Sequence, residues 1–515
     1  IDCIRRDFPS ALDHINSSLD ANRNNYKAYG LKASVLRQME RYIEAENILK
    51  LALEKDPLHP WAGYEMYLSA LNDGSADAKK RLDQLNNLLQ ANKNQSYLEL
   101  ATNYMNCGLW KDAHQVLSTF VDLKNPDSPM IYYYLGYISD KLGQEKQMRR
   151  YYDQANSASP AYCFPFRLES VKVLNHAIEM QPQDDRGHYY LGNLLFYYKQ
   201  ENKAIESWEK SASLNDDYSY VLRNLGMAYE RIQNNPEKAI SYYKQAIEAN
   251  STDSRFFAEL TTLYRKADSP FKERLQMLEN HEQMIKQRDD ALSLLIQTWL
   301  QVGRYDEAIN YLSSHHFRRW EGGGDIRDIY VNAYLLRGLE RYKKGAYNQA
   351  LKDFTQALKY PDNIEAAESY HGGRQAQIHW FIGRAYEAMN KKDKAESHFK
   401  QAVSAKKRGE GREIHYYEAR ALQKLGMKER AHQIFLNIIQ NGKDRLNQTT
   451  SMSFFAKFGE QQSADVQKAN AHYLIGLGYY GVGNNEKAGI EFQQTLELDI
   501  DHIWARHFLE IMNHK

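Results

Sequence analysis

The sequence is poor in the residues that interrupt helices and in those that cross-link a chain. Its 515 residues include only 11 prolines and 3 cysteines. Because proline cannot continue a helix interior, its scarcity favours packed helices over a loop-rich chain. The cysteines, Cys3, Cys107 and Cys163, are too few and too scattered for a disulfide framework or a thiolate metal site. We therefore expect neither of these.

An excess of charge of one sign and long apolar runs are also absent. The 67 Lys and Arg residues balance 66 Asp and Glu residues, which gives a formal net charge of +1. This balance argues against a dedicated nucleic-acid binder, whose phosphate contacts need clustered positive charge. No apolar run approaches the ~18–20 residues of a membrane span. We expect no nucleic-acid partner and no membrane span.

The sequence does contain a repeat with a period of 34 residues. A small residue is followed by Ala twelve positions on, an aromatic residue four later and Ala three after that, as in Gly338, Ala350, Phe354 and Ala357. Other copies are Gly383, Ala395, Phe399 and Ala402; Gly476, Ala488 and Phe492; and, with the first spacing one residue longer, Gly226, Ala239, Tyr243 and Ala246. The period and the residue pattern resemble the tetratricopeptide repeat (TPR), whose unit is a pair of antiparallel helices.

The spacing also has a physical reason of its own. Apolar positions three and four apart share one face of a helix. The small residues of a unit then fall where its two helices cross, and small side chains there let the backbones approach. The large aromatic side chain fills the space left beside them.

The pattern predicts an all-α superhelix, a TPR solenoid, of about 13–14 helical hairpins with a C-terminal capping helix. The capping helix is expected from Asp501 onward, over the apolar face formed by Phe492 and Leu496. The first helices of the hairpins are expected to begin at Tyr26, Asn94, Pro129, Asp185, Ser219, Asp289, Val331, Ala376, Arg412 and Ala469.

Breaks in the period divide the chain. We expect N-terminal repeats at 1–157, the first of them truncated, and central repeats at 158–314, which open with a loop in place of a first helix at Ala158–Arg167. A glycine-rich insertion is expected at 315–330, further repeats at 331–440, a second insertion at 441–468, and the last repeat with the capping helix at 469–515. Insertions in repeat proteins often form the binding face.

Short segments carry a closer resemblance. They are Arg223–Gly226, Arg288–Asp290, Phe317–Gly324, Tyr360–Asn363 and Tyr473–Tyr479. Together they resemble the C-terminal repeat region of a family of large bacterial proteins, in which a β-sandwich domain related in fold to sugar mutarotase-type domains precedes a TPR array. Arg318 and Arg319 stand where the family pattern has His-Pro. The resemblance and the start at Ile1-Asp2 imply a fragment of a longer bacterial protein, periplasmic or cytoplasmic.

The motifs of catalysis are missing. Gly322–Gly324 lack both the Lys-Ser/Thr that follows a phosphate loop and the GxGxxG of a dinucleotide site. No GxSxG elbow is present. The adjacent His315 and His316 do not have the i, i+4 spacing of a metal-binding pair. We expect no cofactor and no enzymatic activity in this chain, and the activity of any upstream domain stays open.

Partner-binding residues are expected on the first helices, which the TPR resemblance places on a concave surface. Aromatic side chains there supply contact area with a polar handle, and Arg supplies bidentate donors. For each of these residues, core packing is as good an interpretation as binding. The candidates are Arg186, Tyr189, Asn193, Tyr220, Arg223, Trp380, Arg384 and Tyr473, with Arg319, Trp320 and Glu321 of the glycine-rich insertion.

Two functions are compatible with these patterns. The first is a non-catalytic scaffold that mediates protein–protein or interdomain interaction, and binds a protein segment or its own upstream domain along the concave groove. The alternative is a carbohydrate-related protein, in which the array supports an upstream β-sandwich that binds or processes a sugar, so a glycan is a further candidate partner. Fold alone does not decide between them.

Overall fold

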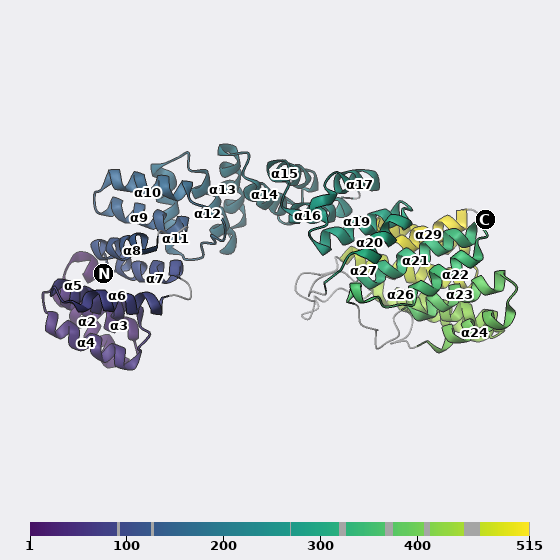
Figure 1. Cartoon of the computed structure of the whole chain (residues 1–515), viewed down its shortest axis with the longest axis horizontal. Helices are drawn as coiled ribbons and strands as arrows, with labels where there is room; N and C mark the ends of the chain where they lie inside the picture. The colour runs from purple at the N-terminus through teal and green to yellow at the C-terminus, as the bar shows by residue number, and fades with distance from the viewer. Residues whose placement is uncertain are drawn as a thin grey trace. The chain divides into compact units, whose positions relative to one another are not determined.

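The computed structural model describes residues 1–89, 93–124, 128–267, 269–318, 326–365, 374–405, 412–447 and 464–513. In these ranges the chain forms twenty-nine α-helices and one 3-10 turn, and no β-strand (Figure 1). The predicted all-α fold is confirmed. The chain divides into two compact units, Ile1–Ala228 (unit 1) and Tyr229–Lys515 (unit 2), with the border inside α14 (Ser219–Arg231).

Unit 1 is built from helical hairpins, in each of which a second helix packs against a first. The hairpins are α3 (Tyr26–Gln38) with α4 (Tyr42–Lys55), α5 (Pro60–Asn72) with α6 (Asp77–Leu88), α7 (Lys93–Asn106) with α8 (Trp110–Lys124), α9 (Pro129–Lys141) with α10 (Glu145–Ser157), and α12 (Asp185–Tyr197) with α13 (Glu201–Leu214). The helices α1 (Asp2–Arg5), α2 (Phe8–Ala21) and α11 (Glu169–Met180) complete this unit.

Unit 2 continues the same architecture. After α15 (Pro236–Ala249) come α16 (Ser254–Lys266) with α17 (Phe271–Asn280), the short α18 (Glu282–Ile285), and α19 (Asp289–Gln301) with α20 (Tyr305–Ser314). Then follow α21 (Ile326–Lys343) with α22 (Tyr347–Ala357), the 3-10 turn η2 (Asp362–Ile364), α23 (Gln375–Ala388) with α24 (Lys392–Ser404), α25 (Glu413–Lys424) with α26 (Lys428–Asn447), α27 (Ala464–Gly481) with α28 (Asn485–Leu498), and α29 (Ile503–Asn513).

The helix starts agree with the repeat period at most positions. Five of the expected first helices begin at the predicted residue, at Tyr26, Pro129, Asp185, Ser219 and Asp289, and those expected at 94, 376 and 412 begin within one residue of it. The remaining two, α21 and α27, begin five residues early, at Ile326 and Ala464. Both are 18 residues long and add more than one turn before the repeat pattern starts.

The small residues of the repeat lie at tight helix crossings. A Cβ atom placed on the glycine would lie only 2.3–2.6 Å from the aromatic ring sixteen residues later. Real Cβ atoms do not approach a ring this closely, so only glycine fits without a shift of the packing. The five pairs are Gly136 with Tyr152, Gly192 with Trp208, Gly338 with Phe354, Gly383 with Phe399, and Gly476 with Phe492.

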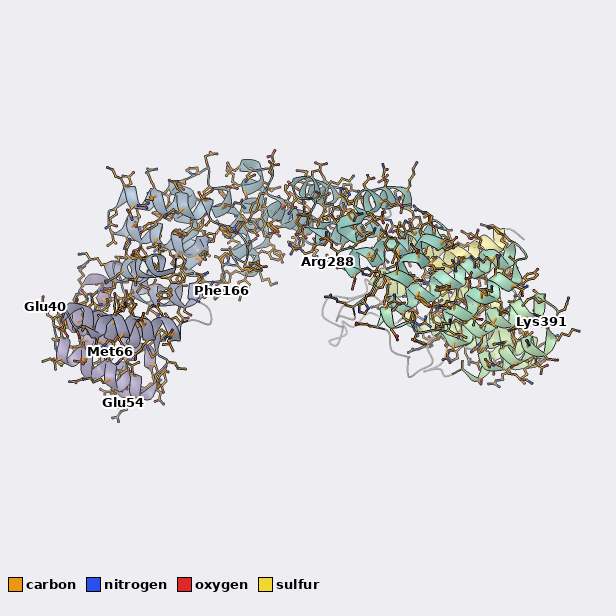
Figure 2. The ribbon with its side chains drawn as sticks, in the orientation of Figure 1. Glu40, Glu54, Met66, Phe166, Arg288 and Lys391 are labelled. Atoms are coloured by element: carbon orange, nitrogen blue, oxygen red, sulfur yellow. The ribbon has the colours of Figure 1, made fainter. Side chains whose placement is uncertain are left out.

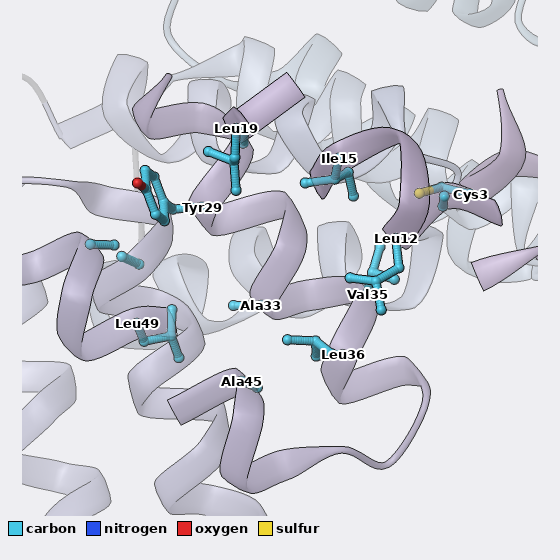
Figure 3. Close-up of a cluster of buried hydrophobic side chains, with 14 residues drawn as sticks. Cys3, Leu12, Ile15, Leu19, Tyr29, Ala33, Val35, Leu36, Ala45 and Leu49 are labelled. Carbon is cyan, nitrogen blue, oxygen red and sulfur yellow. The ribbon is translucent and has the colours of Figure 1, made fainter. Parts of the chain in front are cut away.

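The first hairpins of unit 1 share one hydrophobic core. At the start of unit 1, apolar side chains of α1 to α5 form one buried cluster (Figure 3). Full burial of such a side chain contributes about 1.5–3 kcal/mol relative to exposure. The side chains labelled in the figure are Cys3, Leu12, Ile15, Leu19, Tyr29, Ala33, Val35, Leu36, Ala45 and Leu49.

Two expected irregularities occur where the sequence places them. Between α10 and α11 the chain has no helix, and Cys163–Arg167 runs without regular hydrogen bonding. At the C-terminus, α29 follows α28, and Phe508 stacks on Phe492 with ring centroids 5.2 Å apart. The capping helix is therefore confirmed, although α29 also reaches much farther into unit 2, as described below.

Candidate binding surfaces

The first-helix face of unit 1 is the surface lined by the first helices of its hairpins, and α12 contributes a row of polar and aromatic side chains to it. Arg186, Tyr189 and Asn193 recur at helical spacing on one side of α12. The Arg186 guanidinium lies 3.6 Å from the centroid of the Tyr218 ring, and Tyr189 meets the same ring edge-on at 4.8 Å. Tyr189 is buried by these contacts, so its ring packs the surface from beneath.

The other predicted residues of unit 1 join this row. The Asn193 side-chain oxygen accepts hydrogen bonds from Trp208 Nε1 at 3.1 Å and from Asn224 Nδ2 at 2.9 Å. Tyr220 lies 6.0 Å from Tyr218 with 37% of its surface exposed. Arg223, one residue before Asn224, is on the same helix. The structure thus brings Arg186, Tyr189, Asn193, Tyr220 and Arg223 together.

A buried carboxylate fixes the start of α12. Asp184 caps the helix by accepting a 2.8 Å hydrogen bond from the Gly187 amide. It also accepts hydrogen bonds from the Tyr133 hydroxyl, at 2.9 and 3.0 Å, and from Asn156 Nδ2 at 2.7 Å. Burial raises the pKa of Asp184, and these donors act in the opposite direction. The network ties α12 to α9 and α10 and so sets the position of the α12 face.

Next to this row lies an exposed group of aromatic rings, here called the aromatic patch: Phe164, Phe166, Tyr197 and Tyr198. Their exposed fractions are 70%, 45%, 62% and 36%. The Tyr198 hydroxyl donates a 2.7 Å hydrogen bond to the Phe166 carbonyl, and the Tyr197 and Tyr198 rings are 5.2 Å apart. Figure 2 labels Phe166, which lies beside the helices α7 and α11 of unit 1. The end of α12 and the extended segment are therefore in contact.

The distribution of exposed aromatic side chains is uneven. Among the described residues, eight exposed Tyr or Phe side chains are found, and all belong to unit 1. Six of the eight fall between residues 162 and 220. Side chains of alternate residues point to opposite sides of an extended segment, which is why Cys163 and Pro165 are buried while Phe164 and Phe166 face outward.

A pocket of about 540 Å³ begins where the extended segment enters α11. Its floor includes the buried Tyr137, and the ammonium groups of Lys141 and Lys172 lie 5.0 and 5.9 Å from that ring. Asp140 pairs with Lys141 at 2.8 Å and with His176 at 3.1 Å, and the hydrogen bond from Lys141 lowers the pKa of Asp140. The pocket is lined by Tyr137, Lys141, Leu168, Val171, Lys172, Asn175, His176 and Glu179.

In unit 2 the predicted residues lie in packed surroundings. Trp380 is buried, with the guanidinium groups of Arg384 and Arg420 at 5.5 and 5.6 Å from its ring. Tyr473 is also buried, and its hydroxyl donates a 3.2 Å hydrogen bond to Glu413. Burial raises the pKa of both Tyr473 and Glu413. Trp380 and Tyr473 therefore pack with different partners, and the structure does not bring them into one row as it does the residues of unit 1.

What Tyr473 contacts instead is the C-terminal segment of the chain. Its ring lies 4.3 Å from that of His502 and 6.4 Å from that of Phe508. Sequence reasoning placed α29 at the end of the array and missed that it lies against the first helices of unit 2. The sequence signal for these contacts was the composition of the segment. Asp501, Trp504 and Phe508 follow one another at three and four residues, and a helix that only covers an apolar face does not need the acidic residue.

Of the glycine-rich insertion, the structure describes residues 315–318 and 326–330, and the latter form the start of α21. His315 Nε2 lies 2.9 Å from an oxygen of Asp289, whose other oxygen accepts a 2.9 Å hydrogen bond from the Arg318 amide. Phe317 is buried. The predicted residues Arg319, Trp320 and Glu321 lie outside the described residues.

The described residues offer neither a metal-binding cluster nor a cysteine with a lowered pKa. No three His, Cys, Asp or Glu side chains there are grouped in a way that could hold a metal ion. Burial raises the pKa of the Cys163 thiol, and that of Cys107, to about 12, which disfavours the reactive thiolate. In the described helices, no stretch is long and apolar enough to cross a membrane.

Comparison with known families agrees with the helical hairpins. Models of the tetratricopeptide repeat match four segments, residues 26–57, 131–162, 221–255 and 376–408. Each match begins in or next to a first helix, at α3, α9, α14 and α23. Two of the segments, 221–255 and 376–408, contain copies of the repeat pattern described above.

Relatives with the same repeats share modest identity with this chain. A TPR repeat-containing protein of Methanocaldococcus jannaschii is 26% identical over 216 residues, which cover 39% of this chain and 35% of that protein. Superkiller complex protein 3 of Homo sapiens is 23% identical over 482 residues, 78% of this chain and 30% of that protein. The chain spans about a third of the length of these two relatives.

Solved structures give weak overall superpositions. PilF of Pseudomonas aeruginosa matches with a TM-score of 0.26 and 18% identity, covering 42% of this chain and 88% of that one. The P58(IPK) TPR domain matches with a TM-score of 0.22 and 12% identity, covering 95% and 98%. The assignment of the chain as a TPR protein therefore rests on the repeat models and on its own helical hairpins.

Proposed function

We propose that this TPR protein is a non-catalytic scaffold that binds a segment of a partner protein on the first-helix face of unit 1. TPR proteins generally mediate protein–protein interactions. The observation that supports a site in unit 1 is the aromatic patch, whose four exposed rings belong to two segments, the end of α12 and the extended segment, that the Tyr198–Phe166 hydrogen bond joins. Exposed apolar groups gathered in this way typically mark an interaction site.

The composition of the patch suits a protein segment. Tyr197 and Tyr198 offer flat apolar area with a hydroxyl, while Phe164 and Phe166 offer area alone. The neighbouring Arg186 and Arg223 supply donors for carboxylate or carbonyl oxygens. The partner segment belongs to another protein or to an upstream part of the same one. A glycan that stacks on the same rings is the alternative ligand, and the test below separates the two.

The test uses the full chain and a matched pair of variants. Peptides are selected against the chain from a random displayed library, and their dissociation constants are measured by calorimetry. The double variant Phe166→Ala with Tyr197→Ala should weaken binding at least tenfold, because truncating an aromatic anchor typically costs more than about 1.4 kcal/mol. The control Ile43→Ala removes an apolar side chain of α4 that is 80% exposed, more than either ring, and should leave the dissociation constants unchanged.

Three results would count against the proposal. Unchanged affinities in the double variant would show that the patch is not the site. A lower melting temperature in that variant would show that the rings stabilise the fold. Binding of sugars but not of peptides, lost in the same variant, would favour the glycan alternative.

A further inference from the structure

The C-terminal residues 499–513 lie along the first helices of six successive hairpins of unit 2. These helices are α16, α19, α21, α23, α25 and α27. Figure 1 shows α29, in yellow, beside α19 and α21, which precede it by well over 100 residues. One residue of each first helix that contacts the segment is, in chain order, Arg265, Gln301, Asn332, Phe381, Tyr416 and Tyr473.

The first part of the segment is held by charge. Asp501 accepts hydrogen bonds from Arg274 at 2.5 and 2.9 Å, and forms an ion pair with Arg265 at 2.7 Å. The Arg274 side chain is only 1% exposed. A buried guanidinium without a carboxylate would be an uncompensated buried charge, which is strongly unfavourable. We call the surface of these first helices on which residues 499–513 lie the groove of unit 2. Any segment that covers Arg274 at this end of the groove must therefore supply an acidic group.

The second part of the segment is held by aromatic contacts. Trp504 Nε1 donates a 2.9 Å hydrogen bond to Asn332, and the Arg374 guanidinium lies 5.3 Å from the Trp504 ring. One turn later, Phe508 meets the Tyr416 ring edge-on at 5.6 Å. Trp504 and Phe508 are four residues apart and face the groove from one side of α29, and Asp501 lies two residues before that helix begins.

The segment has the properties of a bound peptide. Residues 499–502 join it to α28. Its helix, α29, has 11 residues. Helices shorter than about 12–15 residues are marginal in water, so α29 owes its order to its packing on α28 and on the first helices.

We propose that the groove of unit 2 is a helix-binding site whose resident ligand is the chain's own C-terminal segment. The partner that fits the same site is an amphipathic helix with an acidic residue, a Trp three positions later and an aromatic residue four positions after the Trp. This site is separate from the aromatic patch of unit 1, and the inference does not rest on the function proposed there.

A tethered segment competes strongly with a free one. A short linker holds its end at an effective concentration in the millimolar range. A free peptide of the same sequence therefore binds the wild-type chain much more weakly than it binds a chain whose own segment is loosened. This difference in affinity would show that the free peptide replaces the chain's own segment.

The experiment uses a fluorescent peptide of residues 499–513 and full-length chains, with binding followed by anisotropy. The Trp504→Ala chain should bind the peptide at least tenfold more tightly than the wild-type chain. The control Ile490→Ala, an exposed residue of α28, should behave like the wild type. Peptides carrying Asp501→Asn or Trp504→Ala should bind the loosened chain at least tenfold more weakly than the native peptide. Phe166→Ala should leave all these values unchanged.

Hydrogen exchange on the wild-type chain provides the second measurement. The amides of α29 should open and exchange faster than those of α27 and α28. If the Trp504→Ala chain is folded and takes up no peptide, the segment is a fixed part of the core and the proposal is wrong. If the variant does not fold, hydrogen exchange of the wild-type chain tests the proposal instead. Amides of α29 that exchange only together with those of α27 and α28 would contradict it.

Discussion

Replacing Gly383 by Ala tests whether the small residues of the repeat are required by packing. Gly383 lies in α23, and a Cβ atom there would stand 2.5 Å from a ring carbon of Phe399. Phe399 is itself buried, so its ring has little room to move. Overpacking of this kind costs about 1–3 kcal/mol. Against this, Ala gains about 0.5–1 kcal/mol over Gly in a helix. We expect a net loss of about 1–2 kcal/mol.

The matched control is Gly489→Ala in α28. The atom closest to its added Cβ would be the terminal methyl of Met512, at 3.4 Å. With no clash to offset the gain in helix propensity, this variant should be more stable by about 0.5–1 kcal/mol. Urea unfolding followed by circular dichroism gives both values, and hydrogen exchange shows whether the loss is confined to α23 and α24. A Gly383→Ala variant at least as stable as the wild type would refute the tight crossing.

Three further changes test other parts of the structure. Asp501→Asn leaves the buried Arg274 without its carboxylate and should cost about 3 kcal/mol, seen in urea unfolding and in faster exchange of α29. Burial lowers the pKa of His502 and His507 from 6.5 to about 4, so both are neutral in the docked segment. Docking of the segment should be most stable above pH 6.5 and should weaken as the pH falls towards 4, because the two histidines bind protons at a higher pH in the undocked segment than in the docked one. Hydrogen-exchange protection factors of α29 at pH 7 and pH 5 measure this change. Ala350→Leu should overpack the α21–α22 crossing by about 1–3 kcal/mol, with faster exchange in that hairpin before any other.

The hairpins were predictable because a repeat pattern describes the contact between neighbours. The spacing of Gly338 and Phe354 encodes a crossing within one hairpin, and the structure confirms it with a 2.4 Å approach. The pattern holds no information on where a segment outside the period will pack. For that reason the C-terminal segment was expected only as a cap over Phe492. The contacts of Trp504 with Asn332 and of Asp501 with Arg274 were not foreseen.

The candidate binding residues were predictable only in position. Helical spacing put Arg186, Tyr189 and Asn193 on one face, as the structure has them, but spacing does not say which ring is covered. Tyr189 is buried beneath Arg186 and Tyr218, whereas Tyr197 two turns later is exposed. The exposed Phe166 lies in the break of the period, where neither helical nor strand spacing was clear enough to assign a face.

The docking of the C-terminus has a consequence for the synthesis of the chain. Most contacts in a repeat array join neighbouring units, so such arrays can fold progressively as they leave the ribosome. In unit 2, the pair of Arg274 and Asp501 joins residues 227 positions apart. The six hairpins from α16 onward therefore complete these contacts only after residues 499–513 have been synthesised. A chain that stops before Asp501 would leave the first helices of all six uncovered and Arg274 without its carboxylate.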